Sequence, residues 1–137
     1  MIVFDVSTLV SATFRRTNVP SRAVRHAFQA DRLAVSEAVL GELAGVLARP
    51  KLVRLLDPEL RSELLWQLDN LGVSFEPTER VTDCRDAKDD KYLELALASG
   101  AGAIVSSDAD LLVLHPWRSV RILRPAEYLA EAEGRGP

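Results

Sequence analysis

Short apolar runs that stop abruptly at a polar residue recur along this chain, and longer segments with helical spacing separate them. The clearest runs occupy residues 2–4, 33–35 and 103–105. Runs this short and continuously apolar are typical of strands buried on both faces, as in parallel sheets. Strands that alternate with helices at this spacing predict a parallel sheet with helices covering both of its faces.

The rest of the pattern predicts further strands and helices. Strands are expected at 73–75 and 120–123, the second with the alternation of an edge strand. Helices are expected from Ser21 to about Ala30 after a loop at 15–20, from Ser36 to about Ala48, from Asp57 to Gly72, from Asp86 to Ser99, and from Pro125 onward. The helix from Asp57 to Gly72 is expected to have an apolar stripe, formed by Leu60, Leu64, Leu65, Leu68 and Leu71. Both tryptophans, Trp66 and Trp117, are expected in the core.

The length and composition are those of one domain. With 137 residues, 47% of them hydrophobic, the chain can close a core by itself, so a single domain over 1–137 is expected, with a frayed tail at 134–137. The single cysteine, Cys84, cannot form an internal disulfide. No apolar run approaches the ~20 residues that span a bilayer, and no leader segment opens the chain. We expect a cytoplasmic protein without membrane association.

Positive charge is concentrated in the first part of the chain. Residues 1–56 contain eight Lys and Arg against four Asp and Glu, whereas residues 57–137 contain nine against sixteen. Arg15, Arg16, Arg22 and Arg25 follow the first expected strand closely. This group could contact the phosphates of a nucleic acid, although a solvated helix face explains any one of these arginines equally well.

Two aspartates follow expected central strands directly. Ligands of open α/β sheets gather at the carboxyl ends of the strands, and both Asp5 and Asp108 are placed there. We therefore expect their carboxylates to lie side by side. The alternative for each is a role only as the N-cap of the next helix, because aspartate is a favoured cap.

Glu42 and Asp89 are expected on helix faces that point toward the protein. Glu42 shares its face with Val39 and Val46, so its carboxylate should point inward; the alternative is a boundary glutamate paired with a nearby Arg or Lys. Asp89 shares its face with apolar residues, whereas Asp86 is the expected cap of the same helix.

Carboxylates gathered without a cation repel one another, so such a cluster predicts a bound metal. Oxygen ligands without a His or Cys cluster favour Mg²⁺ or Mn²⁺ over zinc. Such an ion can activate water and orient a phosphate, so the pattern points to a metal-dependent enzyme of phosphoryl transfer. Asp86, Asp90 and Asp110 are expected as outer neighbours of the metal ligands.

Four segments of the sequence resemble the PIN domain family, in the family's order and over nearly the whole chain. They are Ile-Val-Phe-Asp-Val-Ser-Thr-Leu-Val-Ser-Ala at 2–12, Ser-Glu-Ala-Val-Leu-Gly-Glu-Leu at 36–43, Asp-Ala-Lys-Asp-Asp-Lys-Tyr-Leu-Glu-Leu-Ala at 86–96, and Ile-Val-Ser-Ser-Asp-Ala-Asp-Leu-Leu at 104–112. The chain most resembles bacterial PIN proteins related to VapC, the toxin components of toxin–antitoxin systems. The resemblance implies a Rossmann-like, three-layer α/β/α sandwich with a mostly parallel central sheet.

The resemblance also implies an activity and a site. It implies an endoribonuclease dependent on Mg²⁺ or Mn²⁺, with Asp5, Glu42, Asp89 and Asp108 as the catalytic, metal-binding residues. It further implies an RNA substrate, a small antitoxin partner and a homodimer. Ser7 and Ser106 stand where relatives often have Asn and Thr, and Ala87 replaces a common Pro; these positions bear on the hydrogen bonds that orient the ligands.

Two alternative functions are considered. A haloacid-dehalogenase-like phosphatase also has an aspartate after its first strand, but its second aspartate, two residues later, is Ser7 here. A PIN-like module that binds a partner and cleaves little would keep the fold, and only a cleavage assay separates it from a nuclease.

Overall fold

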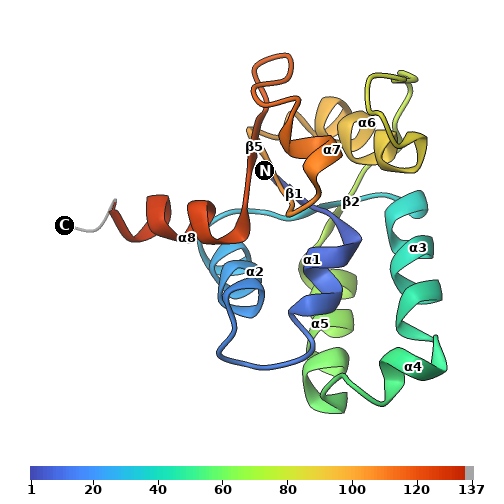
Figure 1. The fold of residues 1–137 in the computed structure, drawn as a ribbon, viewed down its shortest axis with the longest axis vertical. Coiled ribbons are helices and arrows are strands. Elements are labelled where there is room, and N and C mark those ends of the chain that lie inside the picture. The colour runs from blue at the N-terminus through green and yellow to red at the C-terminus, as the bar shows by residue number, and fades with distance from the viewer. Residues whose placement is uncertain (135–137) are drawn as a thin grey trace.

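A parallel sheet with helices on both sides forms the centre of the computed structural model, which describes residues 1–134 (Figure 1). Its strands are β1 (Ile2–Phe4), β2 (Ala34–Val35), β3 (Val73–Ser74), β4 (Ala103–Val105) and β5 (Arg121–Leu123). β4 pairs with β1 and β5, and β2 pairs with β3, all in parallel. A parallel bridge from Ile2 to Leu33 places β2 beside β1, so the spatial order is β3-β2-β1-β4-β5.

The helices form the outer two layers. They are α1 (Val6–Ser11), α2 (Val19–Ala30), α3 (Glu37–Leu47), α4 (Pro50–Val53), α5 (Pro58–Leu71), the 3₁₀ turn η1 (Ala87–Asp89), α6 (Asp90–Ser99), α7 (Ala109–Leu112) and α8 (Pro125–Gly134). In Figure 1, α6 and α7 lie above the sheet, whereas α1, α2, α3 and α5 lie below it. The expected α/β sandwich is therefore confirmed. Within residues 1–134, every helix is too short or too polar to cross a bilayer.

Most of the expected helix ends are confirmed by their caps. Ser36 Oγ accepts a hydrogen bond from the Val39 N–H at the start of α3, and Gly100 ends α6 with a φ of 68°. Gly72 ends α5 for a different reason, since its φ is −67°. A Cβ at Gly72 would lie 2.4 Å from the Leu68 carbonyl oxygen, so this position requires glycine because of the close approach.

Three expectations about the helices need correction. α2 begins at Val19 rather than at Ser21, because the Asn18 side chain caps it by accepting from the Ser21 N–H at 2.8 Å. The helix expected from Asp86 is divided into η1 and α6. The capping alternative for Asp5 implied a helix after it, and α1 is that helix, whereas the short α4 between α3 and α5 was not expected. Of the expected frayed tail, Gly134 ends α8, and 135–137 lie outside the described residues.

The sheet order creates the position for a site. The chain leaves β1 toward β2 on one side, and β4 pairs with β1 on the other, so the order reverses between β1 and β4. Ligands of open parallel sheets bind outside the carboxyl ends of the strands at such a reversal. Val3, Ile104 and Leu93 are fully buried beneath this point, which gives the strand ends a rigid base.

Candidate active site

The parallel register of β1 and β4 brings Asp5 beside Ser106. Phe4 pairs with Val105, so the next residue of each strand emerges at the same edge of the sheet. The Ser106 hydroxyl donates a short hydrogen bond to Asp5 Oδ2 and accepts one from the Asp108 N–H at 2.9 Å. One buried hydroxyl group therefore links the two aspartates that were expected to lie side by side.

Asp5 and Asp108 are also helix caps. Asp5 Oδ1 accepts from the Thr8 N–H at 2.9 Å at the start of α1, and Asp108 Oδ1 accepts from the Asp110 N–H at 2.8 Å at the start of α7. The capping alternative is thus correct for one oxygen of each carboxylate. Capping and clustering are compatible here, because Oδ2 of Asp5 faces Ser106 instead.

Asp89, the last residue of η1 and the N-cap of α6, brings a third carboxylate to this edge. Its backbone is helical and its side chain makes no capping hydrogen bond. Oδ2 of Asp89 is buried and has no hydrogen-bond partner among the described residues. Burial and the adjacent Asp108 carboxylate raise the pKa of Asp89 to about 7.

The pKa of Asp5 is raised as well, mainly by burial, and the charge of Asp108 adds to the effect. Asp108 therefore lies near both Asp5 and Asp89, and these two carboxylates hold their negative charge at a cost. A cation placed among them would remove that cost.

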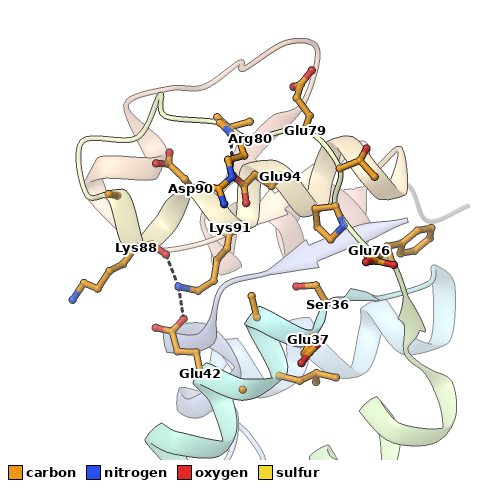
Figure 2. A pocket seen from close by; sticks show the side chains of 18 of the residues that line it. Ser36, Glu37, Glu42, Glu76, Glu79, Arg80, Lys88, Asp90, Lys91 and Glu94 are labelled. Atoms are coloured by element: carbon orange, nitrogen blue, oxygen red, sulfur yellow. Dashed lines mark hydrogen bonds and ion pairs between the residues drawn. The ribbon is translucent and has the colours of Figure 1, made fainter.

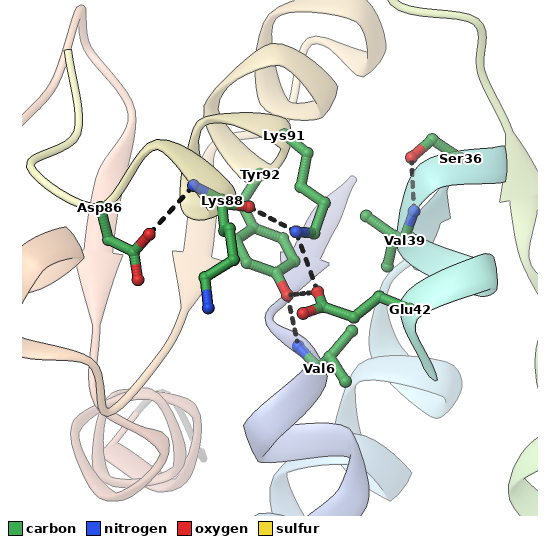
Figure 3. A network of polar contacts seen from close by, with 8 residues as sticks. All are labelled: Val6, Ser36, Val39, Glu42, Asp86, Lys88, Lys91 and Tyr92. Carbon is green, nitrogen blue, oxygen red and sulfur yellow. Dashed lines mark hydrogen bonds and ion pairs between the residues drawn. The ribbon is translucent and has the colours of Figure 1, made fainter. Parts of the chain in front are cut away.

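Glu42, the fourth of the expected carboxylates, already has a cation beside it (Figure 3). Lys91 Nζ is 3.0 Å from Glu42 Oε1, and the Tyr92 hydroxyl donates to the same oxygen at 2.7 Å. The paired boundary glutamate considered as an alternative is the arrangement found. Neither Lys91 nor Tyr92 was predicted as a site residue, although both lie within the Asp-Asp-Lys-Tyr segment that contains Asp89.

An open cleft of about 1640 Å³ adjoins the Glu42–Lys91 pair, between α3, the segment at 74–82 and the start of α6 (Figure 2). Its charged lining residues are Glu37, Glu42, Glu76, Glu79, Asp90, Glu94, Arg80, Lys88 and Lys91. Asp5, Asp89 and Asp108 do not line it. Because carboxylates outnumber cations on its walls, this cleft is a poor path for an RNA backbone.

The residues expected around the metal ligands divide between two roles. Ser106 and the backbone of Asp110 bind the aspartates directly. Asp86 caps η1 through the Lys88 N–H, and the buried Asp90 accepts from the Cys84 N–H at 2.8 Å. Those two side chains hold the segment that positions Asp89, and Ser7 is exposed on α1.

The arginines expected to contact RNA are not gathered at the carboxylates. Arg15 and Arg16 follow the C-terminal end of α1, whereas Asp5 precedes its N-terminal end. Arg16 pairs with Glu63 at 3.1 Å, and Arg22 pairs with Glu133 at 2.9 Å. Arg25 donates to Ser21 Oγ.

The aspartates fit a divalent metal in the kind of donor that they offer. They provide hard carboxylate oxygens, and the buried, unpartnered Oδ2 of Asp89 marks a place where positive charge is missing. Across residues 1–134, however, no three His, Cys, Asp or Glu side chains are already close enough together to form a metal site. Asp5, Asp89 and Asp108 are the residues that would hold such an ion, and Glu42, which the Tyr92 hydroxyl links to the residue after Asp5, would be the fourth carboxylate beside it.

Comparison with known proteins decides the family. Residues 1–110, from β1 into α7, match the PIN domain and include all four of the expected carboxylates. The chain belongs to the PIN domain family. PIN domains are generally nucleases, and PIN nucleases typically use divalent metals.

A relative of this PIN protein is similar over nearly its full length. The uncharacterized protein MJ1680 of Methanocaldococcus jannaschii is 25% identical over 142 aligned positions, which cover 96% of this chain and 91% of that protein.

Proposed function

We propose that this PIN protein is a ribonuclease that hydrolyses RNA phosphodiester bonds with the help of Mg²⁺ or Mn²⁺. The observation that carries the proposal is the group of Asp5, Asp89 and Asp108 at the reversal point of the sheet. Two of the three have raised pKa values, and Asp89 has a buried oxygen without a partner. Such a group is unfavourable in the protein alone and favourable around a divalent cation.

In the proposed reaction the aspartates would hold the ion, and the chemistry that the ion would supply is the activation of water and the stabilisation of the leaving oxygen. Ser106 and the two capping interactions fix Asp5 and Asp108, so that little reorganisation is needed. No histidine acts as a base: His26 packs edge-on against Tyr128, and His115 Nδ1 accepts from the Ile122 N–H.

The biological role that we propose is that of a cytoplasmic toxin. Its partners would be a small cognate antitoxin and a second copy of this chain, as in the relatives that the sequence resembles. Arg15, Arg16, Arg22 and Arg25 remain the proposed contacts to the RNA backbone. Expression alone should slow growth, and co-expression with the neighbouring open reading frame should restore it; harmless expression would argue against the toxin role.

A second candidate is a PIN module that binds without cleaving. The pairing of Glu42 with Lys91 favours it, because a carboxylate that already has a cation is less available to a metal.

A cleavage assay separates the two candidates. The purified protein is incubated with a panel of single-stranded and structured RNAs, with Mg²⁺, with Mn²⁺, or with EDTA. We expect cleavage that requires the metal and is absent from Asp5→Asn, whose amide oxygen can still cap α1. Cleavage that persists in EDTA or in Asp5→Asn would refute the proposed site, and no cleavage of any RNA would favour the binding module.

A further inference from the structure

We propose that Tyr92 is a positioning residue for this site, because its one hydroxyl group fixes Glu42 relative to the start of α1, where Asp5 lies. The consequence for RNA cleavage rests on the proposed function, whereas the consequence for metal binding can be measured without it.

The Tyr92 hydroxyl joins three helices. Tyr92 itself lies on α6 and is only 2% exposed. The hydroxyl donates to Glu42 Oε1 on α3 at 2.7 Å and accepts from the Val6 N–H of α1 at 3.0 Å (Figure 3). The Val6 N–H is one of the first amides of α1, which have no partner within the helix, so Tyr92 satisfies a donor that would otherwise be buried and unpaired.

A phenol hydroxyl suits this double role. It carries one proton, which it donates to Glu42, while its oxygen accepts from the Val6 N–H.

Lys91 acts on the same oxygen as Tyr92. Its Nζ lies 3.0 Å from Glu42 Oε1 and also donates to the Lys88 carbonyl oxygen at the start of α6. Because both donors bind Oε1, the orientation of the carboxylate is fixed. Glu42 is thus held by α6, the helix that begins beside Asp89.

The test uses three variants: Tyr92→Phe, Glu42→Gln, and the double variant that combines these two changes. The control is Tyr128→Phe, which alters the other of the two tyrosines. Binding of Mn²⁺ to the metal-free proteins is followed by electron paramagnetic resonance, and RNA cleavage is followed separately. Removing a side chain that orients a ligand typically weakens metal binding by about 10-fold or more, so we expect that loss for Tyr92→Phe. We expect less than about a 2-fold further loss when Tyr92→Phe is added to Glu42→Gln, since the effect acts through Glu42.

Two results would overturn the inference: Mn²⁺ affinity in Tyr92→Phe equal to that of the wild type, or an equal loss with and without Glu42. Absence of Mn²⁺ binding to the wild type would overturn it together with the metal site. If the wild type binds Mn²⁺ and cleaves no RNA, the ribonuclease proposal fails while the Mn²⁺ comparison still decides the role of Tyr92.

A second measurement does not depend on the folding of Tyr92→Phe. In wild-type protein with ¹³C-labelled tyrosine, the Tyr92 ring signal should shift when Mg²⁺ is added, and the Tyr128 signal should stay constant. A Tyr92 signal that is unchanged at saturating Mg²⁺ would contradict the proposed positioning role.

Discussion

The Ser106 hydroxyl donates its hydrogen to Asp5 Oδ2 across the β1–β4 pair. The same hydroxyl oxygen accepts from the backbone of Asp108, so one small buried side chain orients both aspartates that follow the central strands. The contact is a direct consequence of the parallel register, which places the residues after Phe4 and Val105 next to each other.

Ser106→Ala should weaken both the fold and the site. The change leaves a buried Asp5 oxygen and the Asp108 N–H without their partner, which should lower the free energy of unfolding by about 1–3 kcal/mol. Metal-dependent cleavage should fall by about 10-fold or more. Ser107→Ala, at an exposed neighbouring position, is the matched control in urea unfolding and in the cleavage assay. Equal behaviour of the two variants would show that the Ser106 contact has no role.

The stability of the metal-free protein should fall as the pH rises from about 4 to about 7. The pKa of Asp89 is about 7 in the folded protein, against an ordinary value of 3.8. In this interval the folded state binds more protons than the unfolded state, so each increase in pH favours unfolding.

Asp89→Asn should remove this part of the pH dependence, and Mg²⁺ should reduce it in the wild type by binding the deprotonated carboxylate. Urea midpoints at about pH 5 and about pH 8 give the comparison. Parallel profiles for the wild type and Asp89→Asn would mean that Asp89 does not titrate in this interval.

Two glycines should respond to alanine with opposite signs. Gly72→Ala would place a Cβ 2.4 Å from the Leu68 carbonyl oxygen, so the backbone must move and the free energy of unfolding should fall by at least about 2 kcal/mol. Gly45→Ala, within α3 and with nothing within 4 Å, should raise it by up to about 1 kcal/mol. Thermal unfolding of both variants measures these changes, and it tests the close approach of Gly72 to Leu68 at the end of α5.

RNA binding should become less sensitive to salt when arginines after α1 are neutralised. For single-stranded RNA, each lost phosphate contact should reduce the slope of log affinity against log salt by about 0.7. The double change Arg15→Gln and Arg16→Gln in the Asp5→Asn background isolates binding from cleavage. The control is the double change Arg49→Gln and Arg54→Gln, at exposed positions flanking α4. A slope equal to that of the control would place the RNA path elsewhere.

The parts of the fold that were predictable are those set by local pattern. Continuous apolar runs located β1 and β4, and polar residues at strand ends located Asp5 and Asp108, because the carboxyl ends of parallel strands share one edge. Leu60, Leu64 and Leu68 of α5 are buried as expected. The predicted stripe was too wide, however: Leu65, Leu71 and Trp66 are exposed, Trp66 by 60%.

The contacts of Glu42 could not be read from local pattern. Helical spacing placed Glu42 on an inward face, but its partners come from α6, about 50 residues further along the chain. The cation that pairs with the half-buried Glu42 is determined by how α3 packs against α6. That packing depends on the order of all the strands in the sheet, which local sequence spacing does not reveal.

The position of a bound metal ion is the direct test of the site formed by Asp5, Asp89 and Asp108. Crystals of the protein soaked in Mn²⁺ and measured by anomalous diffraction should show a peak in contact with the carboxylates of Asp5, Asp89 and Asp108, and the same peak should be absent from Asp89→Asn. A peak at another position, or none at a Mn²⁺ concentration that supports cleavage, would contradict the assignment of these three aspartates as the metal site.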